Sequence, residues 1–129
     1  MNNVLLIVED EKEMQELMKI YIKKAGLNLE IYSAYDGKEG VELYKKLMEE
    51  GKKPSLVIMD LKLPGMNGVQ ATKKILEIDP DATIYGFTAF FDTQLAKNLL
   101  KTGAKKIIPR HVGFRGFVDE LKKFFGEST

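Results

Sequence analysis

Cysteine is absent from the 129 residues, which excludes a disulfide scaffold, a thiolate zinc site and a cysteine nucleophile. An excess of one charge is also missing: 20 Lys and Arg stand against 19 Asp and Glu, whereas a general nucleic-acid binder is more basic. No apolar run is long enough to span a membrane. The first run, Val4–Val8, has neither basic residues before it nor a cleavage site after it, which argues against a signal peptide. We therefore expect a cytoplasmic protein with no membrane and no direct nucleic-acid partner.

Short apolar runs of the kind that form buried strands alternate with longer segments of helical periodicity. The runs lie at Val4–Val8, Leu29–Ala34, Leu56–Met59, Thr83–Thr88 and Lys106–Ile108. In the first helical segment, apolar residues spaced by three and four form a stripe. Its members are Met14, Leu17, Met18, Tyr21 and Ala25. Similar segments follow each of the other four predicted strands, so strands and helices alternate along the whole chain.

Five strand and helix pairs with short connections predict an α/β protein whose parallel sheet is covered on both faces. We expect a flavodoxin-like, doubly wound (βα)5 sandwich with the five strands in the order 2-1-3-4-5. No linker, repeat or low-complexity segment divides the chain. We therefore predict a single domain over residues 1–129, with no output domain.

Acidic residues directly follow two of the predicted strands. Glu9, Asp10 and Glu11 come after the first strand, and Asp60 comes after the third. Taken separately, the first three can cap a helix and complement its dipole, and Asp60 can start a turn. In a flavodoxin-like sheet, however, these strands are neighbours, and their ends meet in the crevice where such sheets bind ligands. Clustered carboxylates repel one another, and a set of oxygen ligands favours Mg²⁺ or Mn²⁺.

Four blocks of sequence carry a resemblance to a known family. They are Val8–Glu11, Asp60–Gly68, Thr88–Ala89 and Gly103–Ala104. In content, order and spacing, from about residue 3 to residue 125, the chain resembles the receiver domain of response regulators in two-component signalling.

The resemblance assigns a role to each of five residues. It implies that Asp60 accepts a phosphoryl group and that Glu9 and Asp10, with Asp60 itself, hold Mg²⁺. It also implies that the backbone carbonyl of Lys62 completes the protein ligands and that Thr88 supplies the switch hydroxyl. Independently of the family, a carboxylate that attacks phosphorus needs in-line positioning and neutralised charge more than it needs activation.

The resemblance also implies partners. The phosphate comes from a sensor histidine kinase or a histidine phosphotransfer protein, and the signal or the phosphate passes to a downstream protein. Kinase partners of the family approach a region that here contains Met14 and the segment 112–114. The protein is then a switch that catalyses only its own phosphorylation and dephosphorylation, and a phosphorylation-dependent dimer is left open.

The end of the fifth strand departs from the family pattern. Where the family has Lys followed by Pro, this chain has Arg110 and His111, with Pro109 one residue early. Ile107 occupies the position of the family's aromatic switch residue. We expect Arg110 to replace the lysine as the cation facing the phosphoryl group and to reach the site only when phosphate is bound. Without the proline, we expect a trans Arg110–His111 bond.

Two alternatives to a working receiver stay open on the residues. One is a degenerate receiver, a protein-interaction module that no longer responds to phosphate. The other is a phosphohydrolase with an aspartate nucleophile, which is disfavoured because no second acid lies two residues after Asp60. In a working receiver, the family geometry puts Lys62 and Phe90 beside the path of the hydrolytic water. We expect the apolar Phe90 to shield the phosphoryl group and slow its loss.

Overall fold

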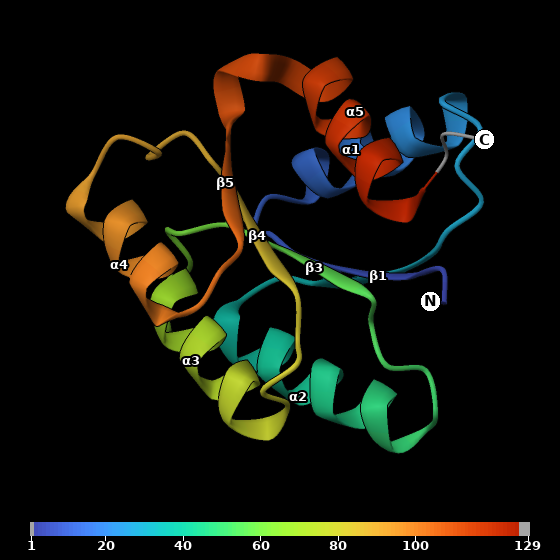
Figure 1. The fold of residues 1–129 in the computed structure, drawn as a ribbon. Coiled ribbons are helices and arrows are strands. Elements are labelled where there is room, and N and C mark those ends of the chain that lie inside the picture. Colours follow the sequence, from blue (N-terminus) through green and yellow to red (C-terminus); the bar gives the residue numbers. More distant parts are fainter. Residues whose placement is uncertain (1, 127–129) are drawn as a thin grey trace.

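A computed structural model describes residues 2–126 as one parallel sheet with helices on both faces (Figure 1). The strands are β1 (Val4–Val8), β2 (Glu30–Ala34), β3 (Leu56–Met59), β4 (Ile84–Thr88) and β5 (Lys106–Pro109). The helices are α1 (Lys12–Lys24), α2 (Gly37–Glu49), α3 (Gly68–Ile78), α4 (Gln94–Thr102) and α5 (Gly113–Phe125), and a 3-10 turn covers Arg110–Val112. Each strand lies within one residue of its predicted bounds.

The order of the strands is β2-β1-β3-β4-β5, and every neighbouring pair is parallel. Helices α1 and α5 cover one face, and α2, α3 and α4 cover the other (Figure 1). The predicted flavodoxin-like architecture is confirmed. Because β1 and β3 lie side by side, the residues that follow them emerge together at the point where the strand order reverses.

β1 shows how the strands divide the core between the two layers of helices. Successive side chains of a strand point to opposite faces. Leu5 and Ile7 pack in the cluster that α1 and α5 cover, whereas Leu6 and Val8 pack with residues of α2, α3 and α4. All five residues of β1 are buried, as expected for a central strand covered on both faces.

The predicted apolar stripe of α1 is rotated from its true position. Leu17 and Tyr21 are each 39% exposed, and the residues that α1 buries are Gln15, Met18 and Ile22. The helix thus buries a polar residue, Gln15, which lies outside the predicted stripe. The reason lies at the end of β1, where buried carbonyl groups need a hydrogen-bond donor.

The loop between β3 and α3 is closed by specific backbone features. Gly65 has a φ of +70°, which favours glycine and fits the turn predicted at Pro64–Gly65. Asn67 then caps α3, and its side chain and that of Gln70 form a reciprocal capping box. The loop therefore returns close to the end of β3, where Asp60 lies.

Candidate functional site

Three carboxylates gather at the ends of β1 and β3. Carboxylate oxygens of Glu9, Asp10 and Asp60 all lie within 4.8 Å of one another. The cause is the sheet order: Val8 pairs with Met59, so the residues that follow leave adjacent strands at the same level. Glu11 is not in the group, and its backbone N–H donates to Glu9 instead. The convergence of three carboxylates in one crevice that the sequence predicted is therefore confirmed.

Glu9 is almost completely buried, with 2% of its surface exposed. Its Oε2 accepts a hydrogen bond from the Glu11 N–H (3.0 Å), and its Oε1 accepts one from Arg110 Nη2 (3.1 Å). Burial raises the pKa of Glu9 to about 7; the charge of Asp60 and a hydrogen bond with the Asp10 side chain add to the shift, and the Glu11 N–H and Arg110 oppose it. Its two hydrogen bonds only partly compensate for its burial.

Asp60 directly follows β3 and is partly buried, with 12% of its side chain exposed. Its Oδ1 accepts a hydrogen bond from the Leu61 N–H at 2.8 Å. Burial raises the pKa of Asp60 above its ordinary value, although Arg110, the Leu61 N–H and Thr88 oppose the shift. A desolvated carboxylate that other acids surround is strongly attractive to a cation.

Gly68 holds the backbone of Asp60 in place. Its N–H donates to the carbonyl of Leu61 (2.9 Å), and a Cβ atom at this position would collide with the Asp60 carbonyl oxygen. Only glycine lets α3 begin so close to the end of β3. Gly68 therefore supports the loop that carries the candidate phosphoacceptor.

Thr88 ends β4 beside Asp60 and is fully buried. Its Oγ1 accepts a hydrogen bond from the Phe90 N–H at 3.0 Å, and its side chain also lowers the pKa of Asp60 through hydrogen bonding. Thr88 thus joins the acidic residues to the loop that follows β4. Its role as a switch hydroxyl stays a prediction.

Arg110 enters the site from the 3-10 turn after β5. Its neighbour Pro109 pairs with Thr88, which sets Arg110 beside the crevice. Nη2 donates to Glu9 Oε1 and to the Phe87 carbonyl, both at 3.1 Å, and the guanidinium carbon lies 4.6 Å from the centre of the Phe87 ring. The distance from Nη2 to Asp60 Oδ1 is 3.9 Å, too long for a hydrogen bond.

These contacts correct one expectation. Arg110 was expected to reach the site only with phosphate bound, and this is wrong, because Glu9 supplies the anion that holds the guanidinium there. The expected trans Arg110–His111 bond is confirmed, since residues 2–126 contain no cis peptide. Ile107 packs against the core cluster of α2, α3 and α4, so β5 presents an aliphatic side chain where the family has an aromatic one.

Lys62 and Phe90 meet above the site. The ammonium of Lys62 lies 4.8 Å from the centre of the Phe90 ring, in a cation–π contact, and both side chains are exposed. Lys62 lies two residues after Asp60, and Phe90 lies two residues after Thr88, so the contact joins the loops after β3 and β4. That the Lys62 carbonyl is a metal ligand stays a prediction.

Gln15 was missed by the sequence analysis. Its side chain is fully buried at the start of α1, and its Nε2 lies within hydrogen-bond distance of the carbonyls of Ile7, Glu9 and Ala34. A signal was available: Met18 and Ile22 are apolar and four residues apart, and the same face extends back to residue 15.

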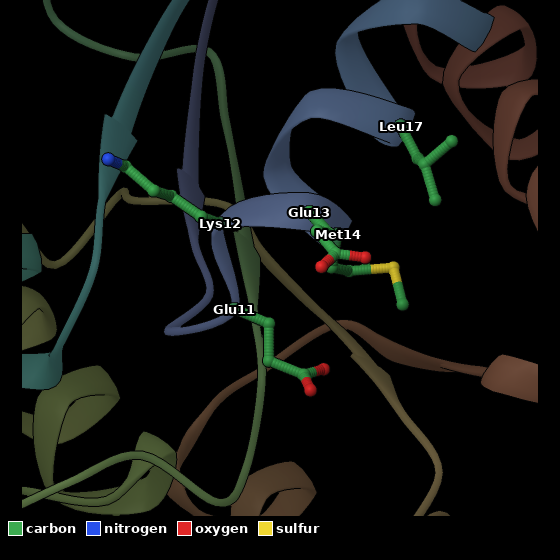
Figure 2. A pocket seen from close by; sticks show the side chains of 5 residues that line it. All are labelled: Glu11, Lys12, Glu13, Met14 and Leu17. Atoms are coloured by element: carbon green, nitrogen blue, oxygen red, sulfur yellow. The ribbon is translucent and has the colours of Figure 1, made fainter.

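A shallow surface pocket lies next to the acidic turn (Figure 2). It is lined by Glu11, Lys12, Glu13, Met14 and Leu17. Figure 2 shows Glu13 and Met14 pointing to one side of α1, with Lys12 turned away. Met14 therefore lines this pocket and is partly accessible, as a docking role requires. That role stays a prediction.

The residues present fit a divalent magnesium-type cation. All the side-chain donors are carboxylate oxygens, which suit a hard ion. Three carboxylates face one guanidinium, so the negative charge of the cluster is only partly balanced by the protein. The exposed Asp10 leaves the cluster open to solvent, and Mg²⁺ usually keeps several waters.

The family model described as the response regulator receiver domain matches residues 5–122. The chain belongs to this family, and the fold and the acidic site agree with it. It is 37% identical to the chemotaxis protein CheY of Thermotoga maritima over 95% of this chain and 98% of that protein. It is 33% identical to CheY of Bacillus subtilis, over 81% and 82% of the two chains.

A solved structure agrees with these relatives. The structure described as the CheX-CheY-BeF3-Mg complex from Borrelia burgdorferi matches with a TM-score of 0.81 and 26% identity, over 95% of this chain and 88% of that one. Among residues 2–126, no helix combines the length and the apolar character needed to cross a membrane.

Proposed function

We propose that this receiver domain is a phosphorylation-dependent switch that accepts a phosphoryl group on Asp60. The main support is the convergence of Glu9, Asp10 and Asp60 within 4.8 Å, on neighbouring strands of a chain that belongs to the receiver family. Asp60 lies beside Leu61 N–H, Thr88 and Arg110, which are donors available to oxygens of a phosphoryl group on Asp60.

In the proposed reaction, a carboxylate oxygen of Asp60 attacks the phosphorus of a phosphohistidine. The new O–P bond forms as the P–N bond breaks, and the leaving imidazole takes a proton. Glu9, Asp10, Asp60 and the carbonyl of Lys62 would hold Mg²⁺. When bound, Mg²⁺ neutralises the charge that develops on the phosphoryl oxygens. Thr88 then donates its hydroxyl to a phosphoryl oxygen.

Arg110 supplies the side-chain cation of the site. Its guanidinium is always charged and can contact two oxygens at once. Nη2 lies 3.9 Å from Asp60, so a small movement brings it to an oxygen of a phosphorylated Asp60. This position supports a working receiver over a degenerate one, because the altered end of β5 keeps a cation beside the acids.

The proposed partners are a sensor histidine kinase or phosphotransfer protein, and a downstream protein. Support comes from the family and from the Borrelia burgdorferi CheY, whose structure is described as a complex with CheX. Met14→Glu should impair phosphotransfer from a kinase but not from acetyl phosphate, because only the protein donor needs a docking surface. An equal loss with both donors would point to a damaged site. That residues 1–129 act alone, in the cytoplasm, is part of the proposal.

The decisive experiment is intact mass measurement after incubation with acetyl phosphate, with and without Mg²⁺. The parent chain should gain a phosphoryl group only when Mg²⁺ is present. Absence of any phosphorylation would instead favour the degenerate receiver. Turnover of a free phosphoester would revive the phosphohydrolase, which the lack of a nearby second acid disfavours.

A further inference from the structure

Gln15 is a polar side chain in an apolar setting. It shares the buried face of α1 with Met18 and Ile22 and has no exposed surface. Its Oε1 has no hydrogen-bond partner among the residues that the structure describes. Leaving a buried oxygen unpaired destabilises a fold, and an apolar side chain such as Met would avoid this cost. Packing alone therefore does not account for glutamine at this position.

The amide nitrogen of Gln15 explains the choice. Nε2 lies 3.1 Å from the Ile7 carbonyl, 3.1 Å from the Glu9 carbonyl and 3.0 Å from the Ala34 carbonyl. A carboxamide has two N–H bonds, so the three acceptors share them. These carbonyls belong to the end of β1, the residue after it, and the end of β2. One side chain of α1 thus ties two strands together where the acidic turn begins.

The tie acts directly on residues of the acidic cluster. The backbone of Glu9 is held on both sides, because its N–H donates to Ala34 O (3.0 Å) and its carbonyl accepts from Gln15. That carbonyl and the N–H of Asp10 belong to the same peptide plane. Fixing the carbonyl therefore fixes the plane from which Asp10 departs. The contact therefore helps to set the backbone orientation of both candidate metal ligands after β1.

We propose that Gln15 is a positioning residue that tunes the acidic turn for Mg²⁺. This inference rests on the proposed function, in which Glu9 and Asp10 help to hold that ion. Mg²⁺ requires short distances and a nearly ideal octahedron, whereas Ca²⁺ tolerates varied geometry and longer distances. A turn that is held rigidly favours the more demanding ion. Gln15 therefore contributes to the selectivity for Mg²⁺ as well as to affinity.

The test is Gln15→Met, which keeps the length of the side chain and removes the donors. Titration calorimetry of the phosphate-free protein should show Mg²⁺ binding weakened by about tenfold or more, the usual result of removing a group that orients a metal ligand. Ca²⁺ binding should weaken less, so the preference for Mg²⁺ falls. Unchanged Mg²⁺ affinity, or an equal loss for both ions, would overturn the inference.

Met18→Ala is the matched control. It removes packing from the same buried face of α1, and the Met18 side chain has no donor for the three carbonyls. It should lower the thermal midpoint and leave both ion affinities unchanged. If it weakened Mg²⁺ binding as much as Gln15→Met does, general loosening of α1 would replace the inference. Should Gln15→Met not fold, Gln15→Leu takes its place with the same two outcomes.

Asp10→Ala separates this inference from the proposed function. If the parent binds Mg²⁺, Asp10→Ala does not, and Gln15→Met binds like the parent, only the role of Gln15 fails. If the parent binds no Mg²⁺, or Asp10→Ala binds as well as the parent, the metal site fails and the inference fails with it.

Discussion

Carboxylates are buried at both ends of the sheet, but their pKa values are shifted in opposite directions. At the carboxyl ends of the strands, burial raises the pKa of Glu9 and of Asp60. At the amino ends, Asp79 lies between α3 and β4 and is also buried. Burial raises the pKa of Asp79 as well, but its hydrogen bonds outweigh burial and the net shift is downward.

The partners of each carboxylate explain the difference. Asp79 Oδ2 accepts from Tyr44 Oη (2.7 Å) and pairs with Lys53 Nζ (2.8 Å), and Oδ1 accepts from the Asp81 N–H (3.1 Å). One carboxylate thus has three donors. At the other end, the cluster has three carboxylates, and the guanidinium of Arg110 pairs with Glu9 and lies 3.9 Å from Asp60. The fold completes the charge balance of Asp79 and leaves that of the acidic cluster incomplete, which marks the cluster as the site that a cation must complete.

The sharpest contrast comes from one substitution at each end. Asp60→Asn should abolish phosphorylation by acetyl phosphate, because an amide of the same shape cannot form the acyl phosphate. Asp79→Asn should leave phosphorylation intact but reduce stability by about 1–3 kcal/mol, because it weakens a buried hydrogen-bonded group. Intact mass and thermal unfolding, measured on both variants, check this. Equal phosphorylation of Asp60→Asn and the parent would reject Asp60 as the acceptor.

The next largest effect concerns the incomplete charge balance itself. Asp10→Ala should weaken Mg²⁺ binding by about tenfold or more, because a hard ion depends on anionic oxygens. Asp81→Ala, which removes an exposed acid near Asp79, should bind Mg²⁺ like the parent. Titration calorimetry measures both. Similar losses in the two variants would mean that only overall charge matters.

Removing the guanidinium of Arg110 should strengthen Mg²⁺ binding, whereas removing a carboxylate weakens it. Arg110→Ala should bind Mg²⁺ several-fold more tightly, because Arg110 no longer neutralises Glu9 or occupies its Oε1. Arg110→Lys, which keeps the charge, should lie between this variant and the parent. Weaker binding by Arg110→Ala would show that Arg110 orders the acids instead of competing for them.

The same variant also tests the switch. Arg110→Ala should still be phosphorylated on Asp60 but should lose most of the phosphate-induced change in amide exchange over α4 and β5. Switching like that of the parent would remove Arg110 from the signalling path.

A smaller effect is expected on the lifetime of the phosphate. Phe90→Glu should speed phosphate loss several-fold, because it replaces an apolar shield with a group that can orient water and also breaks the contact with Lys62. Phe91→Glu is the matched control, since Phe91 is also exposed but packs against His111. Decay of the phosphorylated mass with time gives the rates. An unchanged or slower rate for Phe90→Glu would count against shielding.

The smallest effect is a pH dependence that differs between the two ends. The pKa of Glu9 is about 7 in the folded chain and has its ordinary value of 4.5 in the unfolded chain. As the pH falls, Glu9 is therefore protonated in the folded chain before it is protonated in the unfolded chain. In metal-free buffer, stability should rise as the pH falls across this interval. The lowered pKa of Asp79 has the opposite sign: its contribution is present above its ordinary value of 3.8 and is lost as the pH falls through the folded value.

Thermal unfolding from pH 8 to pH 3 should separate these two contributions. Glu9→Gln should reduce the rise, since only the raised pKa of Asp60 then contributes to it, and Asp79→Asn should reduce the loss below about pH 4. A rise of unchanged size in Glu9→Gln would assign the effect to another group.

Most of the fold could be predicted from local patterns. Each strand of the sheet is a nearly continuous apolar run, and such runs are recognisable without knowledge of their neighbours. The order of the strands followed from the expectation of a flavodoxin-like fold, which the regular alternation of strands and helices indicated. With that order, the positions of Glu9, Asp10 and Asp60 already implied one acidic crevice. Thr88, Lys62 and Arg110 came from the resemblance alone.

Tertiary structure decided which groups face one another. Arg110 pairs with Glu9, which lies 101 residues earlier in the chain. The sequence around either residue does not predict this contact. Gln15 lies outside the predicted stripe but is buried, because carbonyls of two strands lie beneath α1. Periodicity reports how much of a helix or strand is buried, but not against which polar atoms. Those contacts depend on strand register and helix rotation, which the packing of the whole chain sets.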